Sequence, residues 1–122
     1  LLMAAATPLQ AAPLTVRTGE SFVFTLKNGQ PANARKVGAT AKPAKGQILV
    51  TVKPLMGTAM FMTNKTGVAY TFRAEVLQGG KAVNARPCTL PATDRPIFEQ
   101  WQQKADAVRI GDFKVARKDG SC

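Results

Sequence analysis

Residues 67–77 carry the clearest structural pattern in the chain, because apolar and polar side chains alternate there with a period of two. The apolar face consists of Val68, Tyr70, Phe72, Ala74 and Val76. Polar residues occupy the other face, and Gln78-Gly79-Gly80 follows as a turn. The pattern predicts a half-buried strand, with Tyr70 and Phe72 in the core and with Arg73 and Glu75 pairing with neighbouring strands.

Similar alternation predicts further short strands on both sides of this one. They cover residues 14–18, 22–26, 48–52, 58–63, 81–86 and 108–115, with a weaker edge strand through Val37, Ala39 and Ala41. In the first strands the inward positions are Leu14, Val16, Phe22, Phe24 and Leu26. In the last strand the inward phase changes at Gly111-Asp112, which predicts a β-bulge.

Two stretches resemble known sandwich domains. The pattern Leu14-x-Val16-x-x-Gly19-Glu20-x-Phe22-x-Phe24-x-Leu26 resembles the first two strands of immunoglobulin-like sandwiches, and residues 66–73 resemble the sixth strand of a fibronectin type III domain. The resemblance implies an antiparallel β-sandwich. Together with turn residues about every ten positions, it predicts an all-β, immunoglobulin-like or fibronectin-III-like fold of seven or eight short strands.

The region from Pro91 to Ala107 interrupts this rhythm. Thr93 or Asp94 could cap a helix, with Pro96 in its first turn. Ile97, Trp101, Ala105 and Val108 would then share one helical face. We therefore expect one short helix near residues 95–105, and a bent strand through residues 97–101 is the alternative.

The amino-terminal residues 1–12 have the composition expected at the end of a secretory signal peptide, or else form a disordered arm. Residues 13–122 are then long enough for a single domain.

Cys88 and Cys122 form an even pair, so in an oxidising compartment we expect one disulfide, with an unpaired buried Cys88 as the alternative. These features predict a periplasmic or secreted protein. The chain contains no apolar run of about 18 residues, so we expect no transmembrane segment.

Residue types argue against catalysis. The chain has no histidine, which excludes Ser-His-Asp and Cys-His catalysis and every His-ligated metal site. Its seven carboxylates fall in no recognisable motif, although a glycosidase would need only two. We expect no enzyme activity and no cofactor.

Three methionines lie at even-numbered positions, so an extended backbone would place their thioethers on one face: Met56, Met60 and Met62. Thioethers are ligands for Cu(I), and this makes copper binding a minor alternative. Packing into the core is the simpler interpretation of these methionines.

Charge is distributed unevenly along the chain. The net charge is +10, and no acidic residue lies between Glu20 and Glu75. The candidate anion-binding residues in this span are Lys27, Arg35, Lys36, Lys42, Lys45 and Lys65. Such a segment attracts anions, although a solvated basic surface that discourages aggregation would have the same composition. Nucleic acid is a weaker alternative, because most aromatic residues fall on predicted core faces.

From these patterns we expect a non-catalytic, envelope-associated binding or structural module with an unknown protein or an anionic envelope component as partner. The alternative is a basic module that binds an anionic polymer or lipid surface through residues 27–65.

Overall fold

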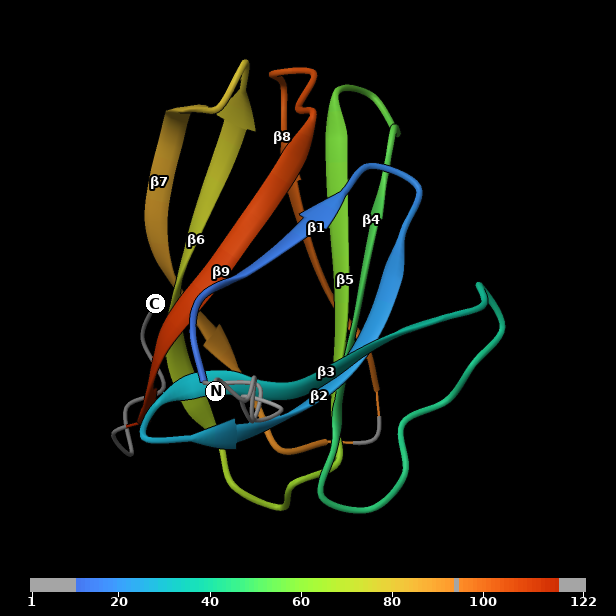
Figure 1. The fold of residues 1–122 in the computed structure, drawn as a ribbon, viewed down its shortest axis with the longest axis vertical. Helices are drawn as coiled ribbons and strands as arrows, with labels where there is room; N and C mark the ends of the chain where they lie inside the picture. Colours follow the sequence, from blue (N-terminus) through green and yellow to red (C-terminus); the bar gives the residue numbers. More distant parts are fainter. Residues whose placement is uncertain (1–10, 94, 117–122) are drawn as a thin grey trace, which may run out of the picture.

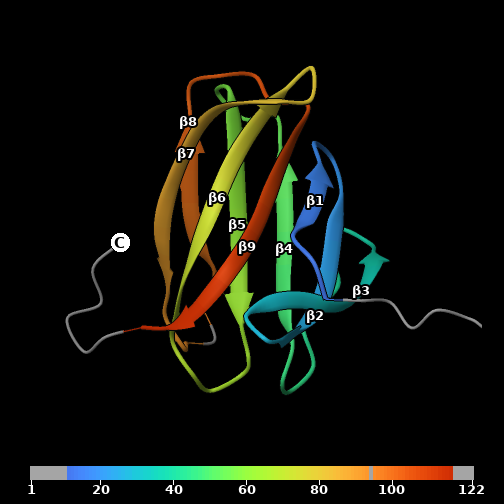
Figure 2. The same cartoon turned by 60° about the vertical axis from the view of Figure 1, so that its left-hand side comes forward.

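The computed structural model describes residues 11–93 and 95–116, and these form nine strands in two antiparallel sheets (Figure 1). The four-stranded sheet contains, in spatial order, β1 (Leu14–Arg17), β9 (Ala107–Val115), β6 (Tyr70–Gln78) and β7 (Lys81–Leu90). The five-stranded sheet contains β3 (Gln30–Val37), β2 (Ser21–Lys27), β4 (Ile48–Lys53), β5 (Thr58–Asn64) and β8 (Ile97–Trp101). The predicted all-β class is confirmed, with nine strands in place of seven or eight. The two sheets pack face to face in a sandwich-like arrangement (Figure 2).

The core lies between the two sheets, where alternating residues of both inner faces meet. In β6 the residues Phe72, Ala74 and Val76 are buried, and in β4 the residues Ile48, Val50 and Val52 are fully buried. The predicted inward faces are therefore confirmed for these residues, whereas Tyr70, also predicted in the core, is only partly buried and packs against it. Val68 precedes β6 and is partly exposed, so the strand begins two residues later than the alternation predicted.

The predicted helix near residues 95–105 is wrong, because residues 97–101 form β8 at the edge of the five-stranded sheet. Its backbone pairs with β5, with Ile97 opposite Met62 and Trp101 opposite Thr58. A separation of four residues is in phase with both a helix and a strand, so Ile97 and Trp101 could not distinguish the two. Pairing with β5, a long-range interaction, decided in favour of the strand.

An edge strand does precede the long connection at residues 38–47, but it lies earlier than predicted. Residues 30–37 form β3, which pairs with β2 only, and the predicted positions Ala39 and Ala41 fall outside it. In β2, Phe24 is buried while Phe22 and Leu26 pack against the core as partly buried residues. Val23 is also buried, but it pairs with Leu49 and so lies on the outer side of the sheet, and the register of β2 with β3 shifts between Val23 and Thr25.

The predicted bulge at Gly111-Asp112 is confirmed. The pairing of β9 with β6 shifts its register there, and Asp112 has a positive φ of 55°. Because of the extra residue, Phe113 faces the core on the same side of the sheet as Val108 and Ile110, although its number has the opposite parity. The Phe113 ring lies 5.1 Å from Phe72 and 5.9 Å from Phe24, measured between centroids.

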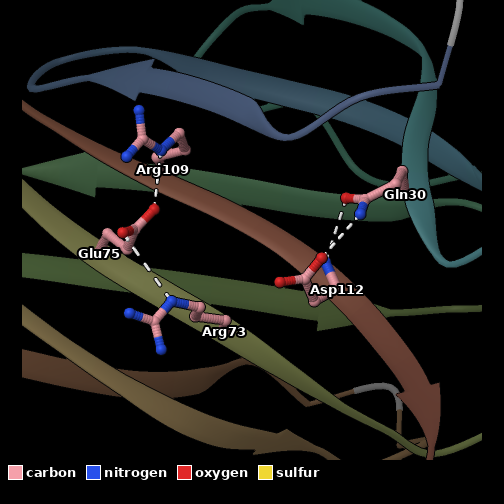
Figure 3. A network of polar contacts seen from close by, with 5 residues as sticks. All are labelled: Gln30, Arg73, Glu75, Arg109 and Asp112. Carbon is pink, nitrogen blue, oxygen red and sulfur yellow. Dashed lines mark hydrogen bonds and ion pairs between the residues drawn. The ribbon is translucent and has the colours of Figure 1, made fainter.

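The turn between β2 and β3 is fastened to this bulge, which joins the two sheets along one side. The Phe113 N–H donates a hydrogen bond to the Gly29 carbonyl (2.7 Å). The Gln30 side chain donates to Asp112 Oδ1 (2.7 Å) and accepts from the Asp112 N–H (3.1 Å), as Figure 3 shows. Asn28 and Gly29 both have positive φ, as expected for a two-residue hairpin turn.

We predict that Gly29→Ala destabilises the protein more than Gly80→Ala does. Both glycines occupy the second position of a two-residue turn with φ near +80°, so each substitution carries a backbone cost of about 1 kcal/mol. A Cβ at Gly29 would also lie 2.7 Å from the Phe113 carbonyl oxygen, whereas a Cβ at Gly80 would meet open space. We expect Gly29→Ala to lower the free energy of unfolding by about 2 kcal/mol more, as measured by chemical denaturation. Equal losses for the two variants would show that the turn does not depend on its contact with β9.

Candidate anion-binding site

The structure brings together three of the six predicted anion-binding residues. Lys42 and Lys45 lie in the connection between β3 and β4, and Lys65 begins the connection between β5 and β6. Both connections lie at the lower end of the molecule in Figure 1. Lys27 ends β2, and Arg35 and Lys36 lie on the edge strand β3, so these three do not join the cluster. The name basic cluster is used below for Lys42, Lys45 and Lys65.

Backbone hydrogen bonds hold the two connections against each other. The Gly46 N–H donates to the Lys65 carbonyl (2.8 Å), and the Lys65 N–H donates to the Gln47 carbonyl (2.9 Å). Gln47 also closes its own turn, because its side-chain oxygen accepts from the Ala44 N–H (2.9 Å). The Pro-Ala-Lys-Gly-Gln sequence thus forms a turn, as its proline and glycine predict, and the turn presents Lys45 beside Lys65.

The buried Asn64 side chain orders the second connection. Its Oδ1 accepts hydrogen bonds from the Thr66 N–H (2.9 Å) and the Thr66 hydroxyl (2.7 Å), and its Nδ2 donates to the Val68 carbonyl (2.8 Å). This local network fixes the chain on both sides of Lys65. The position of the lysine is therefore set by the backbone, and the residue is exposed to solvent.

Two adjoining hollows lie beside the basic cluster and share Lys65. The larger, about 370 Å³, is lined by Ala41, Lys42, Pro43, Leu49, Thr63 and Lys65. The smaller, about 290 Å³, is lined by Lys45, Asn64, Lys65, Gly67 and Ala92. Both are open to solvent. The larger therefore combines an apolar floor, to which Leu49 and Pro43 contribute, with the two lysines Lys42 and Lys65.

No lysine of the basic cluster makes an ion pair with any residue that the structure describes. The carboxylates elsewhere have other partners. Lys36 pairs with Glu20 (3.2 Å), and the Arg17 backbone N–H, with Lys36, lowers the pKa of that carboxyl group. Asp94, two residues after Ala92, lies outside the described residues. The basic cluster thus offers three charged donors with no internal partner within the described chain.

A second polar network lies on the outer face of the four-stranded sheet (Figure 3). Arg109 Nε donates to Glu75 Oε1 at 2.7 Å across the β6–β9 pair, and Arg73 Nε lies 3.8 Å from Glu75 Oε2. The hydrogen bond from Arg109 is the largest cause of a lowered pKa at Glu75, and Glu75 in turn raises the pKa of Arg109. The prediction that Glu75 pairs with a neighbouring strand is confirmed, whereas Arg73, predicted to do the same, lies nearest to Glu75 of its own strand.

The three methionines do not share one surface. Met60 and Met62 are fully buried on β5, whereas Met56 is 81% exposed in the turn before that strand. The structure therefore separates the thioethers proposed as Cu(I) ligands. In the described part of the chain there is also no group of three histidine, cysteine, aspartate or glutamate residues that could hold a metal.

Cys88 lies on β7 opposite Phe72 and is fully buried in the core. Its predicted disulfide partner, Cys122, lies outside the described residues, so the disulfide stays a prediction. The predicted signal segment likewise falls almost wholly outside them.

The apolar floor of the larger hollow was missed in the sequence. Leu49 occupies an outward position between the inward residues Ile48 and Val50 and is only partly exposed. An apolar residue on the polar face of an alternating strand is the signal that could have identified this floor. The convergence of the lysines depends on strand order, which alternation does not encode.

We predict that Glu75→Gln destabilises the protein at pH 7 and that this effect becomes smaller as the pH falls below 4.5. Because the folded-state pKa of Glu75 is lowered, its stabilising contribution is present above the ordinary value of 4.5 and is lost as pH falls through the lower folded pKa. The expected loss at pH 7 is about 0.5 kcal/mol, as for other exposed ion pairs, measured by urea denaturation. Arg109→Gln should have a similar effect and Arg73→Gln a smaller one. An undiminished difference between Glu75→Gln and the original protein at pH 3 would contradict the pairing.

Comparison with known proteins adds no further constraint. No family model, no curated protein and no solved structure matches this chain. Within the described residues, no helix is long and apolar enough to cross a membrane. The residues of the chain itself therefore carry the functional argument.

Proposed function

We propose that this protein is a non-catalytic binding module that takes an anionic polymer or surface at the basic cluster. The observation that carries the proposal is the convergence of Lys42, Lys45 and Lys65 around two adjoining hollows that share Lys65. None of the three ammonium groups has an ion-pair partner in the described part of the chain. A ligand with several negative charges could satisfy all three.

The overall charge supports the same function. A net charge of +10 creates a positive field that attracts polyanions and increases their association rate, and salt screens this attraction. Lysine ammonium groups on flexible stems suit a ligand with repeated, loosely spaced charges better than a single planar group. The ligand we expect is therefore extended and multiply charged.

The proposed setting is the cell envelope, in an exported protein with an immunoglobulin-like sandwich. Two packed antiparallel sheets and the stretch from Leu14 to Leu26 support the sandwich type. The composition of residues 1–12 and the even cysteine count support export. Binding is favoured over catalysis because the chain has no histidine and because no carboxylate among the described residues lines either hollow.

We predict that replacing all three lysines of the basic cluster by glutamine weakens binding to inorganic polyphosphate about tenfold or more at low salt. Each lost contact is expected to contribute about 0.5–1 kcal/mol. The dissociation constant would be measured by isothermal titration over a salt series from 20 to 300 mM, chosen to span screening lengths from roughly 20 Å to 6 Å. For the original protein, affinity should fall steeply with salt, and for the triple variant the slope should be shallower.

The matched control is the triple variant Lys27→Gln, Lys81→Gln and Lys104→Gln. It has the same net charge as the cluster variant, but its three substituted residues line neither of the two hollows of the basic cluster. It should retain most of the affinity. If both variants weaken equally, the basic residues act only as a diffuse solvated surface and the proposed site is wrong.

We also predict that the exported protein contains a Cys88–Cys122 disulfide. Intact mass spectrometry before and after reduction should show a gain of two hydrogens, and alkylation should label both cysteines only after reduction. Labelling of Cys122 without reductant would contradict the disulfide and weaken the argument for export.

A further inference from the structure

Two phenylalanines form an exposed pair on the outer face of the five-stranded sheet. Phe61 on β5 and Phe98 on the edge strand β8 lie directly opposite each other, and their ring centroids are 5.1 Å apart. Phe98 is 50% exposed, and Phe61 is partly exposed. The interior of the sandwich is already filled by other aromatic residues, so this outward pair is not needed to build the core.

A lysine borders the same pair. Lys53 Nζ lies 5.5 Å from the centroid of the Phe61 ring, a distance at which an ammonium group is attracted to the ring face. Lys53 is exposed at the end of β4, and its contact with Phe61 leaves the ammonium group at the surface. The aromatic pair therefore has a positive charge beside it.

The aromatic pair and the basic cluster lie on one continuous face. Along β5, Thr63 lines the larger hollow and Phe61 follows two residues away on the same side, a separation of about 7 Å. The register repeats this order on the neighbouring strand, where Leu49 is opposite Thr63 and Thr51 is opposite Phe61. A ligand held by Lys42 and Lys65 that runs along β5 would therefore reach Phe61 and Phe98.

We propose that the ligand of the basic cluster is an acidic glycan, and that the aromatic pair binds one of its sugar rings. This inference rests on the proposed function and adds the class of ligand. Carboxylates on the glycan would meet Lys42, Lys65 and Lys53, while the C–H face of a sugar ring would pack on the exposed side of Phe98. Only a polymer that alternates charges with apolar faces uses both parts of this surface.

The geometry favours a glycan over other polyanions. Phe61 is bordered by Phe98 on one side and Lys53 on another, which leaves Phe98 as the open ring of the pair. Single-stranded nucleic acids bind best to several successive aromatic rings that each stack a base. The pair on β5 and the edge strand β8 presents two rings, a smaller apolar surface than the apolar face of a membrane-bound helix. One open ring on the same sheet face as Lys53 and the larger hollow therefore fits a chain of charged sugars best.

The test compares Phe98→Thr with the original protein on three probes. These are polygalacturonate, its fully methyl-esterified form, which has the same backbone without charge, and inorganic polyphosphate, which has charge without sugar rings. We expect Phe98→Thr to weaken polygalacturonate binding about fivefold and to leave polyphosphate binding unchanged, as measured by isothermal titration. Phe98→Tyr should restore binding, and the esterified polymer should bind weakly to every variant.

Threonine is a good strand former, and Phe98 lies on an edge strand, so the substituted protein should fold. Val83→Thr, a partly exposed position on the edge of the other sheet, is the control for a lost apolar surface residue. Thermal denaturation of each variant would show that folding is retained.

The outcomes separate the two proposals. If the basic-cluster variant loses polyphosphate and polygalacturonate binding while Phe98→Thr binds both normally, the proposed function stands and the glycan inference is wrong. If single-stranded oligonucleotides or phosphatidylglycerol vesicles bind more tightly than polygalacturonate and depend on Phe98, the ligand class is wrong. Polyphosphate binding that is insensitive to the basic cluster overturns both proposals.

Discussion

The bulge at Gly111-Asp112 is the feature on which the rest of the sandwich depends. Without the extra residue, strict alternation after Ile110 would direct Asp112 inward and Phe113 outward. With it, Phe113 enters the core against Phe24 of the opposite sheet, and Asp112 is free to bind the Gln30 side chain. One local irregularity thus connects the two sheets both through the core and along their side.

The order of strands in the five-stranded sheet explains why the lysine-bearing connections are neighbours. β3 pairs with one side of β2 and β4 with the other, so the chain must pass from the edge strand β3 across to β4 through residues 38–47. That connection comes to lie beside the turn that follows β5, and Lys42 and Lys45 are thereby placed next to Lys65. Strand order, more than any local motif, creates the basic cluster.

The sequence predicted the structure correctly where the spacing of apolar residues fits only a strand. It failed where the same spacing fits both a helix and a strand. Val52 and Phe72 alternate with polar neighbours and are buried as predicted, and the phase change at Gly111 identified the bulge. Ile97 and Trp101 are spaced equally well for a helix and a strand, so only their pairing with β5 could decide. Likewise, the sequence contained six candidate cations, but their spatial grouping depends on which loops become neighbours. The outward Leu49 and Phe98 interrupt the polar faces of their strands, and such interruptions deserve to be considered as binding residues.

The way in which Lys65 is held has a consequence for how tightly the site can bind. Its amide and carbonyl groups are both used in hydrogen bonds to Gln47 and Gly46, and Asn64 orders the residues after it. The backbone of the site is therefore preorganised, and a ligand would lose entropy mainly by ordering lysine side chains and its own chain. Affinity should consequently grow with the length and stiffness of the ligand, and a stiff polymer should be preferred over a flexible one of equal charge.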